Sequence, residues 1–119
     1  MDVELFAGIA VSDLERAIDW YGRFFGGTES FEPNDTERVW TVAEHRYLYV
    51  ELNPEHSGHA MVTLFVEDFG RFVGAVAQRG INPEISETYE NGVRKVIYRD
   101  PDSNEVAVVG APVEPETKL

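Results

Sequence analysis

One short pattern occurs twice in this chain, and its repetition limits the possible folds more than any other feature. Residues 11–16 read Val-Ser-Asp-Leu-Glu-Arg and residues 66–71 read Val-Glu-Asp-Phe-Gly-Arg, an offset of 55 residues. Self-similarity at a fixed offset indicates that one supersecondary unit has been built twice. A chain of 119 residues has room for one domain. We therefore expect both units to share a single hydrophobic core.

Each copy of the pattern opens a predicted helix. Apolar residues recur at three- and four-residue steps over residues 14–25 and again over residues 69–76, which is the spacing of one buried helix face. Ser12 followed by Glu15 predicts a capping box at the first helix, and glycines 26, 27 and 80 predict where the two helices end. The two helices therefore occupy equivalent places in the repeat.

A strand-like stretch precedes each predicted helix, and three short ones follow it. The predicted strands span residues 5–11, 27–31, 38–42 and 46–52 in the first unit, and residues 60–66, 83–89, 93–99 and 105–109 in the second. This order predicts an α+β fold of two βαβββ modules that form a cupped mixed β-sheet with the helices on its outer face. We expect one domain over residues 1–110, with modules at about 1–55 and 56–110, and a flexible tail over 111–119.

The charge balance limits the partners. Lys and Arg total 10 against 22 Asp and Glu, a formal net charge of −12 that opposes binding to nucleic acid or to an anionic membrane. The chain has no cysteine, which excludes disulfides and thiolate metal sites. Its first residues lack a secretory pattern and no apolar run is long enough to span a bilayer, so we expect a cytoplasmic location.

These modules resemble the vicinal oxygen chelate superfamily, which includes glyoxalases, bleomycin resistance proteins and extradiol dioxygenases. The apolar strand that leads into residues 11–16, followed by Trp20-Tyr21 and a glycine-containing helix end, is similar to the family's opening signature. Residues 100–104 read Asp-Pro-Asp-Ser-Asn and resemble its closing Asp-Pro-Asp-Gly-Asn turn, with Ser103 where glycine is usual. The resemblance covers nearly the whole chain up to Gly110.

The resemblance also implies where a metal would lie. Enzymes of this family hold a divalent ion on the open sheet face with four side chains, two from each module. The corresponding positions in this chain are Phe6, Tyr49, Met61 and Ala107. None of them is a histidine or a carboxylate, so we expect no metal, no other cofactor and no catalytic residue there. A displaced metal site that pairs His59 with Glu51 is the alternative.

Strand pairing predicts what lines the open face instead. If Glu44-His45 is a two-residue hairpin turn, Trp40 lies opposite Tyr49 and Arg38 lies opposite Glu51. This predicts an apolar, aromatic-walled pocket with an acidic group, suited to a flat organic cation, although the same aromatics could fill a closed core or a dimer interface. The predicted ligand-binding residues are Phe6, Arg38, Trp40, Tyr47, Tyr49, Glu51, Met61, Phe65 and Ala107.

Three kinds of function fit these observations. The first is a metal-free protein that sequesters an aromatic or cationic small molecule, as the bleomycin-resistance branch does, and the resemblance implies a homodimer. The second is a lyase, isomerase or dioxygenase-like enzyme that uses displaced metal ligands, or Glu51 with Tyr47 or Tyr49 in acid–base chemistry. The third is a partner-binding or regulatory domain with a filled cavity. The absence of metal ligands and the negative charge favour the first.

Overall fold

Eight strands and two helices follow one another in the predicted order. The computed structural model describes residues 1–113. A short 3-10 helix, η1 (Pro54–His56), joins the two modules. The first module comprises β1 (Leu5–Val11), α1 (Leu14–Phe25), β2 (Ser30–Asn34), β3 (Glu37–Ala43) and β4 (Arg46–Leu52). The second comprises β5 (Met61–Val66), α2 (Phe69–Gln78), β6 (Ile85–Thr88), β7 (Arg94–Arg99) and β8 (Glu105–Gly110). The repeat therefore predicted both modules, with β2 beginning three residues later than expected.

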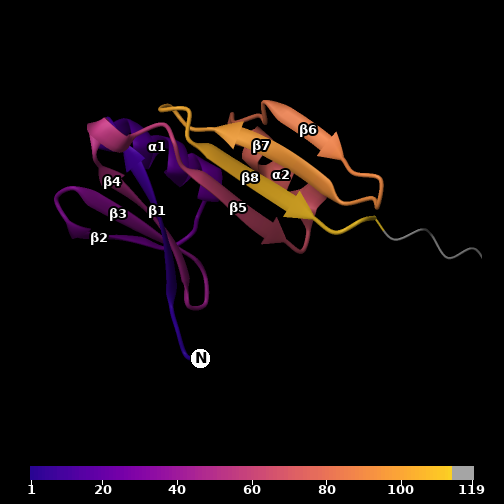
Figure 1. Cartoon of the computed structure of the whole chain (residues 1–119), viewed down its shortest axis with the longest axis horizontal. Coiled ribbons are helices and arrows are strands. Elements are labelled where there is room, and N and C mark those ends of the chain that lie inside the picture. The colour runs from indigo at the N-terminus through magenta and orange to yellow at the C-terminus, as the bar shows by residue number, and fades with distance from the viewer. Residues whose placement is uncertain (114–119) are drawn as a thin grey trace, which may run out of the picture.

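Each module forms its own four-stranded mixed sheet. The strand orders are β1-β4-β3-β2 and β5-β8-β7-β6, with β1 parallel to β4, β5 parallel to β8 and the other pairs antiparallel. The modules lie side by side along the long axis of the molecule, and β1 and β5 are the edge strands nearest their boundary (Figure 1). The structure is thus the predicted α+β arrangement, as two sheets of matching topology.

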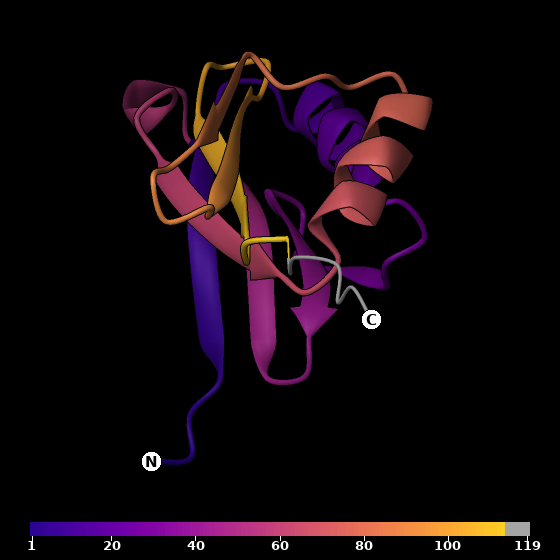
Figure 2. The same cartoon turned by 90° about the vertical axis from the view of Figure 1, so that its right-hand side faces the viewer.

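Both helices lie on the same side of the strands and pack against each other (Figure 2). The apolar face of α1 is buried through Ala17, Trp20, Tyr21 and Phe24. The ring of Phe24 lies 5.6 Å from that of Phe72 on α2 and 5.0 Å from that of Tyr98 on β7, so α1 packs against the second module as well as its own. A single apolar core therefore spans both modules, as the short chain length led us to expect.

The start of α1 differs from the predicted capping box. The Asp13 side chain is the N-cap and accepts a hydrogen bond from the backbone N–H of Arg16 at 3.0 Å. The Ser12 hydroxyl instead donates to Asp102 in the other module. Asp68 caps α2 in the same way, through the N–H of Arg71 at 3.2 Å. The repeated aspartate is therefore the capping residue, and the serine is freed to join the modules.

Buried polar groups tie the modules together where the ends of β1 and β4 meet the starts of β5 and β8. The fully buried Asn104 side chain donates to the carbonyl of Ala10 and accepts from the N–H groups of Gly58 and Ala60, each at 3.0 Å. The hydroxyl of Tyr21 donates to buried Asp100 at 2.8 Å. Since each partner lies in a different segment, this network fixes the angle between the modules. We call the side chains of Tyr21, Asp100 and Asn104 the polar junction.

No helix within residues 1–113 is long and apolar enough to cross a membrane. The predicted flexible tail is described only at residues 111–113, which follow β8 without helix or strand structure, and its remainder lies outside the described residues.

Candidate functional site

The face of the first sheet that points away from the helices is aromatic. On β1 and β4, which pair in parallel, Phe6 lies beside Tyr47 and Gly8 beside Tyr49. The rings of Phe6 and Tyr47 stack with centroids 4.3 Å apart and an interplanar angle of 13°. A Cβ atom added to Gly8 would lie 2.6 Å from the Tyr49 ring, so that ring lies directly across the glycine. We call Phe6, Tyr47 and Tyr49 the aromatic panel.

Two carboxylates end this panel. Glu51 on β4 is directly opposite Glu37 on β3, and the parity of β4 places it on the same face as Tyr47 and Tyr49. Like charges directly opposite each other destabilise a sheet. Glu37 accepts a hydrogen bond from the Asn34 amide, and among residues 1–113 neither carboxylate forms an ion pair with Lys, Arg or His. The panel therefore ends in an uncompensated negative charge.

The predicted places of Trp40 and Arg38 were wrong. The turn at Glu44-His45 forms as expected, but the register shifts between Thr41 and Ala43, so that Trp40 pairs with Leu48 and Arg38 with Val50. The extra residue is a β-bulge, and a one-residue slip moves every side chain beyond it to the other face. Trp40 is consequently 2% exposed in the core beneath α1. Arg38 bonds to Ser30 and, at 2.8 Å, to Glu32.

The corresponding face of the second sheet leaves two large apolar side chains exposed on its edge strand. Met61 is 77% exposed and Phe65 is 65% exposed, both on the edge strand β5. Ala107 has the register of the same face, opposite Thr63, but it is fully buried. Within the described residues, Met61 and Ala107 line no cavity with the aromatic panel. Phe65 and Tyr47 are both among the residues that line a cleft. One chain thus brings the first-module residues together and leaves Met61 and Phe65 uncovered.

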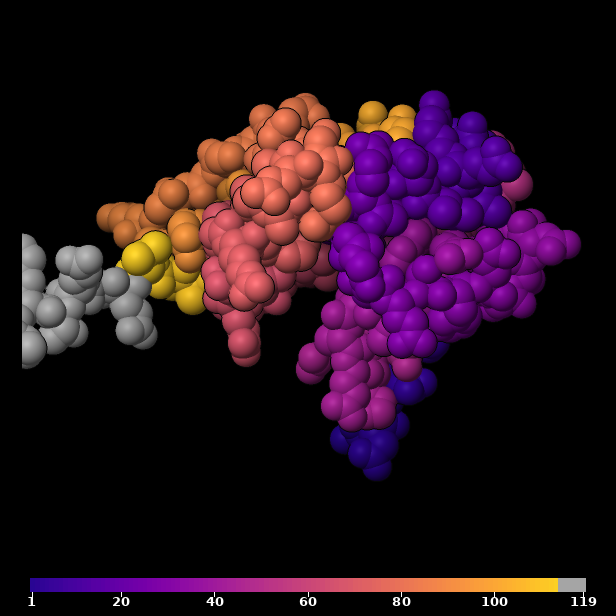
Figure 3. All heavy atoms as spheres, turned by 180° about the vertical axis from the view of Figure 1, so that it is seen from behind, coloured from indigo at the N-terminus to yellow at the C-terminus, as the bar shows by residue number. Residues whose placement is uncertain are grey.

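A hollow lies on the helix side of the sheets, between the modules. A cleft of about 490 Å³ separates the β3–β4 hairpin from β5 and α2 (Figure 3). Its walls are mainly apolar side chains on the helix-facing positions of both sheets and at the ends of the helices, including Leu5, Phe25, Val42, Leu48, Val62 and Phe72. The sequence patterns did not predict this cleft, because alternation within a strand says nothing about how closely two modules approach.

The donor groups do not fit a metal centre. The positions at which the family resemblance places ligands hold Phe6, Tyr49, Met61 and Ala107. Within residues 1–113, no three or more His, Asp or Glu side chains gather as a metal would require, and the proposed pair of His59 and Glu51 gains no third ligand. In a chain without cysteine, imidazole and carboxylate are the main side-chain ligands for a divalent transition metal.

The hydroxyl of Tyr47 is engaged outside the panel. It donates to Glu4 at 3.1 Å, and His45 also contacts Glu4, at 3.2 Å. Loss of hydration and this carboxylate raise the pKa of Tyr47 above its ordinary value. A phenol with a raised pKa is a weaker acid at neutral pH, and its bond leads to Glu4 rather than to Glu51. The geometry therefore does not support Tyr47 as the acid–base partner of Glu51.

Sequence reasoning missed Glu37, which was not among the candidate residues. Its only signal was its place near the start of a strand, and the bulge that pairs it with Glu51 has no clear mark in the sequence. Gly8 was not a candidate residue either, although its pairing with Tyr49 shows that the glycine makes room for the Tyr49 ring.

Comparison with known proteins agrees with this architecture. The family model described as Glyoxalase/Bleomycin resistance protein/Dioxygenase superfamily matches residues 5–108. No curated protein sequence matches the chain. A solved glyoxalase/bleomycin resistance protein from Catenulispora acidiphila is 46% identical, with a TM-score of 0.90, and the match covers 93% of this chain and all of that one.

More distant structures share the fold alone. A glyoxalase/bleomycin resistance protein/dioxygenase from Alicyclobacillus acidocaldarius is 17% identical with a TM-score of 0.75, over 92% of this chain and 91% of its own. The fosfomycin resistance protein FosX from Listeria monocytogenes is 8% identical with a TM-score of 0.71, over 95% of this chain and 96% of its own. The match of the family model over nearly the whole chain identifies this protein as a member of the Glyoxalase/Bleomycin resistance protein/Dioxygenase superfamily.

Proposed function

We propose that this protein binds a flat organic cation without a metal, on the open face of its first sheet. The observation that carries the proposal is the aromatic panel, which ends in the paired carboxylates of Glu37 and Glu51. A ligand ring can stack on Tyr47 or Tyr49, and a positive charge at its end can relieve the repulsion between the two glutamates. The net charge of −12 raises the local concentration of cations further.

The proposal includes a second copy of the chain. Phe6, at 48% exposed, and the more exposed Met61 and Phe65 leave large apolar side chains in solvent on the two edge strands. Edge strands with apolar side chains favour pairing with another chain. A second copy that set its β5 face against the aromatic panel would supply Met61 and Phe65 as the other wall of the predicted pocket. Light scattering should then give a mass of twice the 13.4 kDa chain.

The test uses two probes with the same ring system that differ in charge and one N-methyl group: N-methylacridinium, a permanent cation, and acridine, which is neutral at slightly alkaline pH. Calorimetry should show binding of the cation, and Glu51→Gln should weaken it roughly tenfold while changing acridine affinity less than about twofold. Glu90→Gln, in an exposed turn, removes one negative charge elsewhere and is the matched control.

A second substitution tests the panel without removing a ring. Gly8→Ala places a methyl group where the Tyr49 ring now lies, so the ring must move. We expect both probes to bind more weakly to Gly8→Ala than to the unaltered protein. Equal binding of the two probes, or a Glu90→Gln effect as large as that of Glu51→Gln, would remove the basis of the proposal. A bleomycin titration then asks whether a cationic glycopeptide is accepted.

A further inference from the structure

We propose that the cleft on the helix side is a second binding site, and that it takes an apolar carboxylate held by Arg46. The cleft shares Tyr47 with the aromatic panel and Phe65 with the proposed second wall, but its charged residue, Arg46, belongs to neither, so the inference does not depend on the proposed function. Its volume of about 490 Å³ falls in the range of small-molecule pockets, about 300–1,000 Å³.

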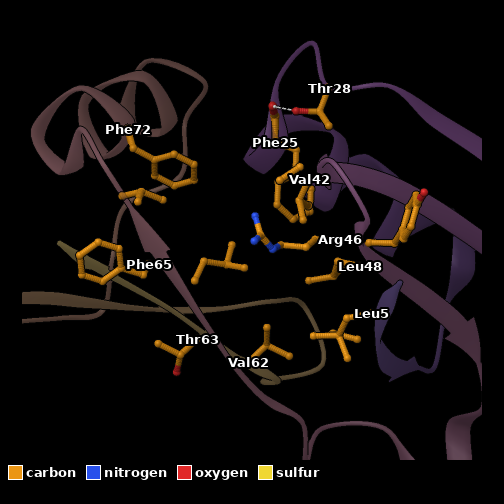
Figure 4. Close-up of a pocket in the computed structure, with 15 residues that line it drawn as sticks. Leu5, Phe25, Thr28, Val42, Arg46, Leu48, Val62, Thr63, Phe65 and Phe72 are labelled. Carbon is orange, nitrogen blue, oxygen red and sulfur yellow. Dashed lines mark hydrogen bonds between the residues drawn. The ribbon is translucent and has the colours of Figure 1, made fainter. Parts of the chain in front are cut away.

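The walls of the cleft select for an apolar body. Phe65 and Phe72 line it from the second module, while Phe25, Val42 and Leu48 line it from the first (Figure 4). The hydroxyl of Thr28 already donates to the carbonyl of Phe25 at 2.8 Å, so it offers the ligand no free proton. Burial of hydrocarbon against such walls is favourable in proportion to the area that is covered.

Arg46 is the charged residue among those that line the cleft, and its guanidinium reaches between the two walls (Figure 4). In the part of the chain that the structure describes, this guanidinium forms no hydrogen bond or ion pair with the protein. Six other arginines bond to carboxylates or to backbone carbonyls: Arg16, Arg23, Arg38, Arg79, Arg94 and Arg99.

Among residues 1–113, Arg46 and Arg71 are both exposed and unpaired, and Arg46 differs in that it lines an apolar cleft. The lining contains no aspartate or glutamate, so the charge inside the cleft is positive although the protein is strongly acidic. The five N–H donors of a guanidinium match the two oxygens of a carboxylate, and apolar surroundings strengthen that pair. The complementary ligand is therefore a carboxylate on a hydrocarbon body of moderate length.

The experiment compares decanoate with decanol, which share a chain and differ in charge, by calorimetry below the concentrations at which either aggregates. Decanoate should bind the unaltered protein, and Arg46→Gln should reduce its affinity roughly tenfold. Decanol should bind more weakly and equally to both proteins. Arg71→Gln, on the exposed first turn of α2, is the matched loss of one cation. Gly8→Ala, which displaces the ring of Tyr49, a residue that does not line the cleft, should leave decanoate binding unchanged.

Three results would overturn the proposal. The first is decanoate affinity that differs less than about twofold between Arg46→Gln and the unaltered protein. The second is equal loss of decanoate binding in Arg71→Gln, which would assign the effect to overall charge. The third combines two observations: decanoate does not bind the unaltered protein, and Arg46→Gln changes the mass measured by light scattering. Together they would show that the cleft is an interface between copies of the chain.

Discussion

The two ends of the module boundary are built on opposite principles. At the polar junction, buried side chains of Tyr21, Asp100 and Asn104 make directed hydrogen bonds between segments of both modules. At the other end, the modules separate and leave an apolar cleft with a lone guanidinium. The directed hydrogen bonds fix the angle between the modules, whereas the walls of the cleft do not touch and place no restraint on that angle. The angle between the modules is thus set at one end and its consequence, an open hollow, appears at the other.

This difference predicts a gradient of stability, with the largest losses at the polar junction. Asn104→Ala removes the acceptor of two backbone N–H groups and the donor to Ala10. Because each buried group left unpaired costs about 1–3 kcal/mol, we expect the free energy of unfolding to fall by about 3 kcal/mol in chemical denaturation. Asn91→Ala, whose side chain serves a single exposed turn, should cost less than about 1 kcal/mol. Similar losses in both would show that the junction is not special.

Tyr21→Phe should have the next largest effect and should depend on pH. It removes a hydrogen bond to a carboxylate, and we expect a loss of about 2 kcal/mol near neutral pH. Burial and the neighbouring Asp100 raise the pKa of Tyr21 in the folded state, so the contribution is complete below the unfolded pKa of about 10. Above that pH only the unfolded tyrosine ionises, which stabilises the unfolded state.

The advantage of the unaltered protein over Tyr21→Phe should therefore shrink above about pH 10, by up to about 1.4 kcal/mol per pH unit. Denaturant unfolding of both proteins between neutral and strongly alkaline pH measures this difference, and the remaining tyrosines cancel. Tyr89→Phe, at an exposed ring, should alter stability by less than about 0.5 kcal/mol at every pH. A difference that stays constant through the alkaline range would contradict the assignment.

The smallest effect is expected at the cleft. Phe72 is half-buried, with its ring against Phe24 on one side and the hollow on the other. Phe72→Ala should cost about 1 kcal/mol, well below the ~3–5 kcal/mol of a fully packed phenylalanine, because one side of the ring has no partner to lose. Phe31→Ala, on the exposed face of β2, is the control and should change stability by less than about 0.5 kcal/mol. A loss above about 3 kcal/mol would indicate that the cleft is closed in solution.

Local patterns in the sequence predicted most of the fold. The repeat of residues 11–16 at 66–71 predicted both helices, and the predicted strand pattern placed Tyr47 and Tyr49 on the open face of the sheet. In the structure they lie on that face of β4, and Leu48 and Val50 are buried on the other. Those features depend on neighbours a few residues apart. The extra residue near Val42 carries no comparable mark, since a bulge depends on how the hairpin closes as a whole. The face of the sheet on which each side chain lies was therefore predicted correctly on β4 and wrongly on most of β3.

The cleft and the fit between modules lie further beyond such patterns. Asn104 could be read as part of a closing turn, yet its bonds to Ala10, Gly58 and Ala60 join segments that are distant in the sequence. Arg46 follows a turn and resembles any solvated arginine until both modules are in place. The surroundings of these side chains form only when the two modules pack together, so residue type alone does not predict them.

The bulge near Val42 has a consequence for how members of this fold can diverge. One residue more or less in the hairpin exchanges the two faces of β3, so that a tryptophan and an arginine trade places with a valine and a glutamate. A one-residue insertion or deletion could therefore change which side chains lie on a binding surface in one evolutionary step. The codons of the exchanged side chains would stay the same.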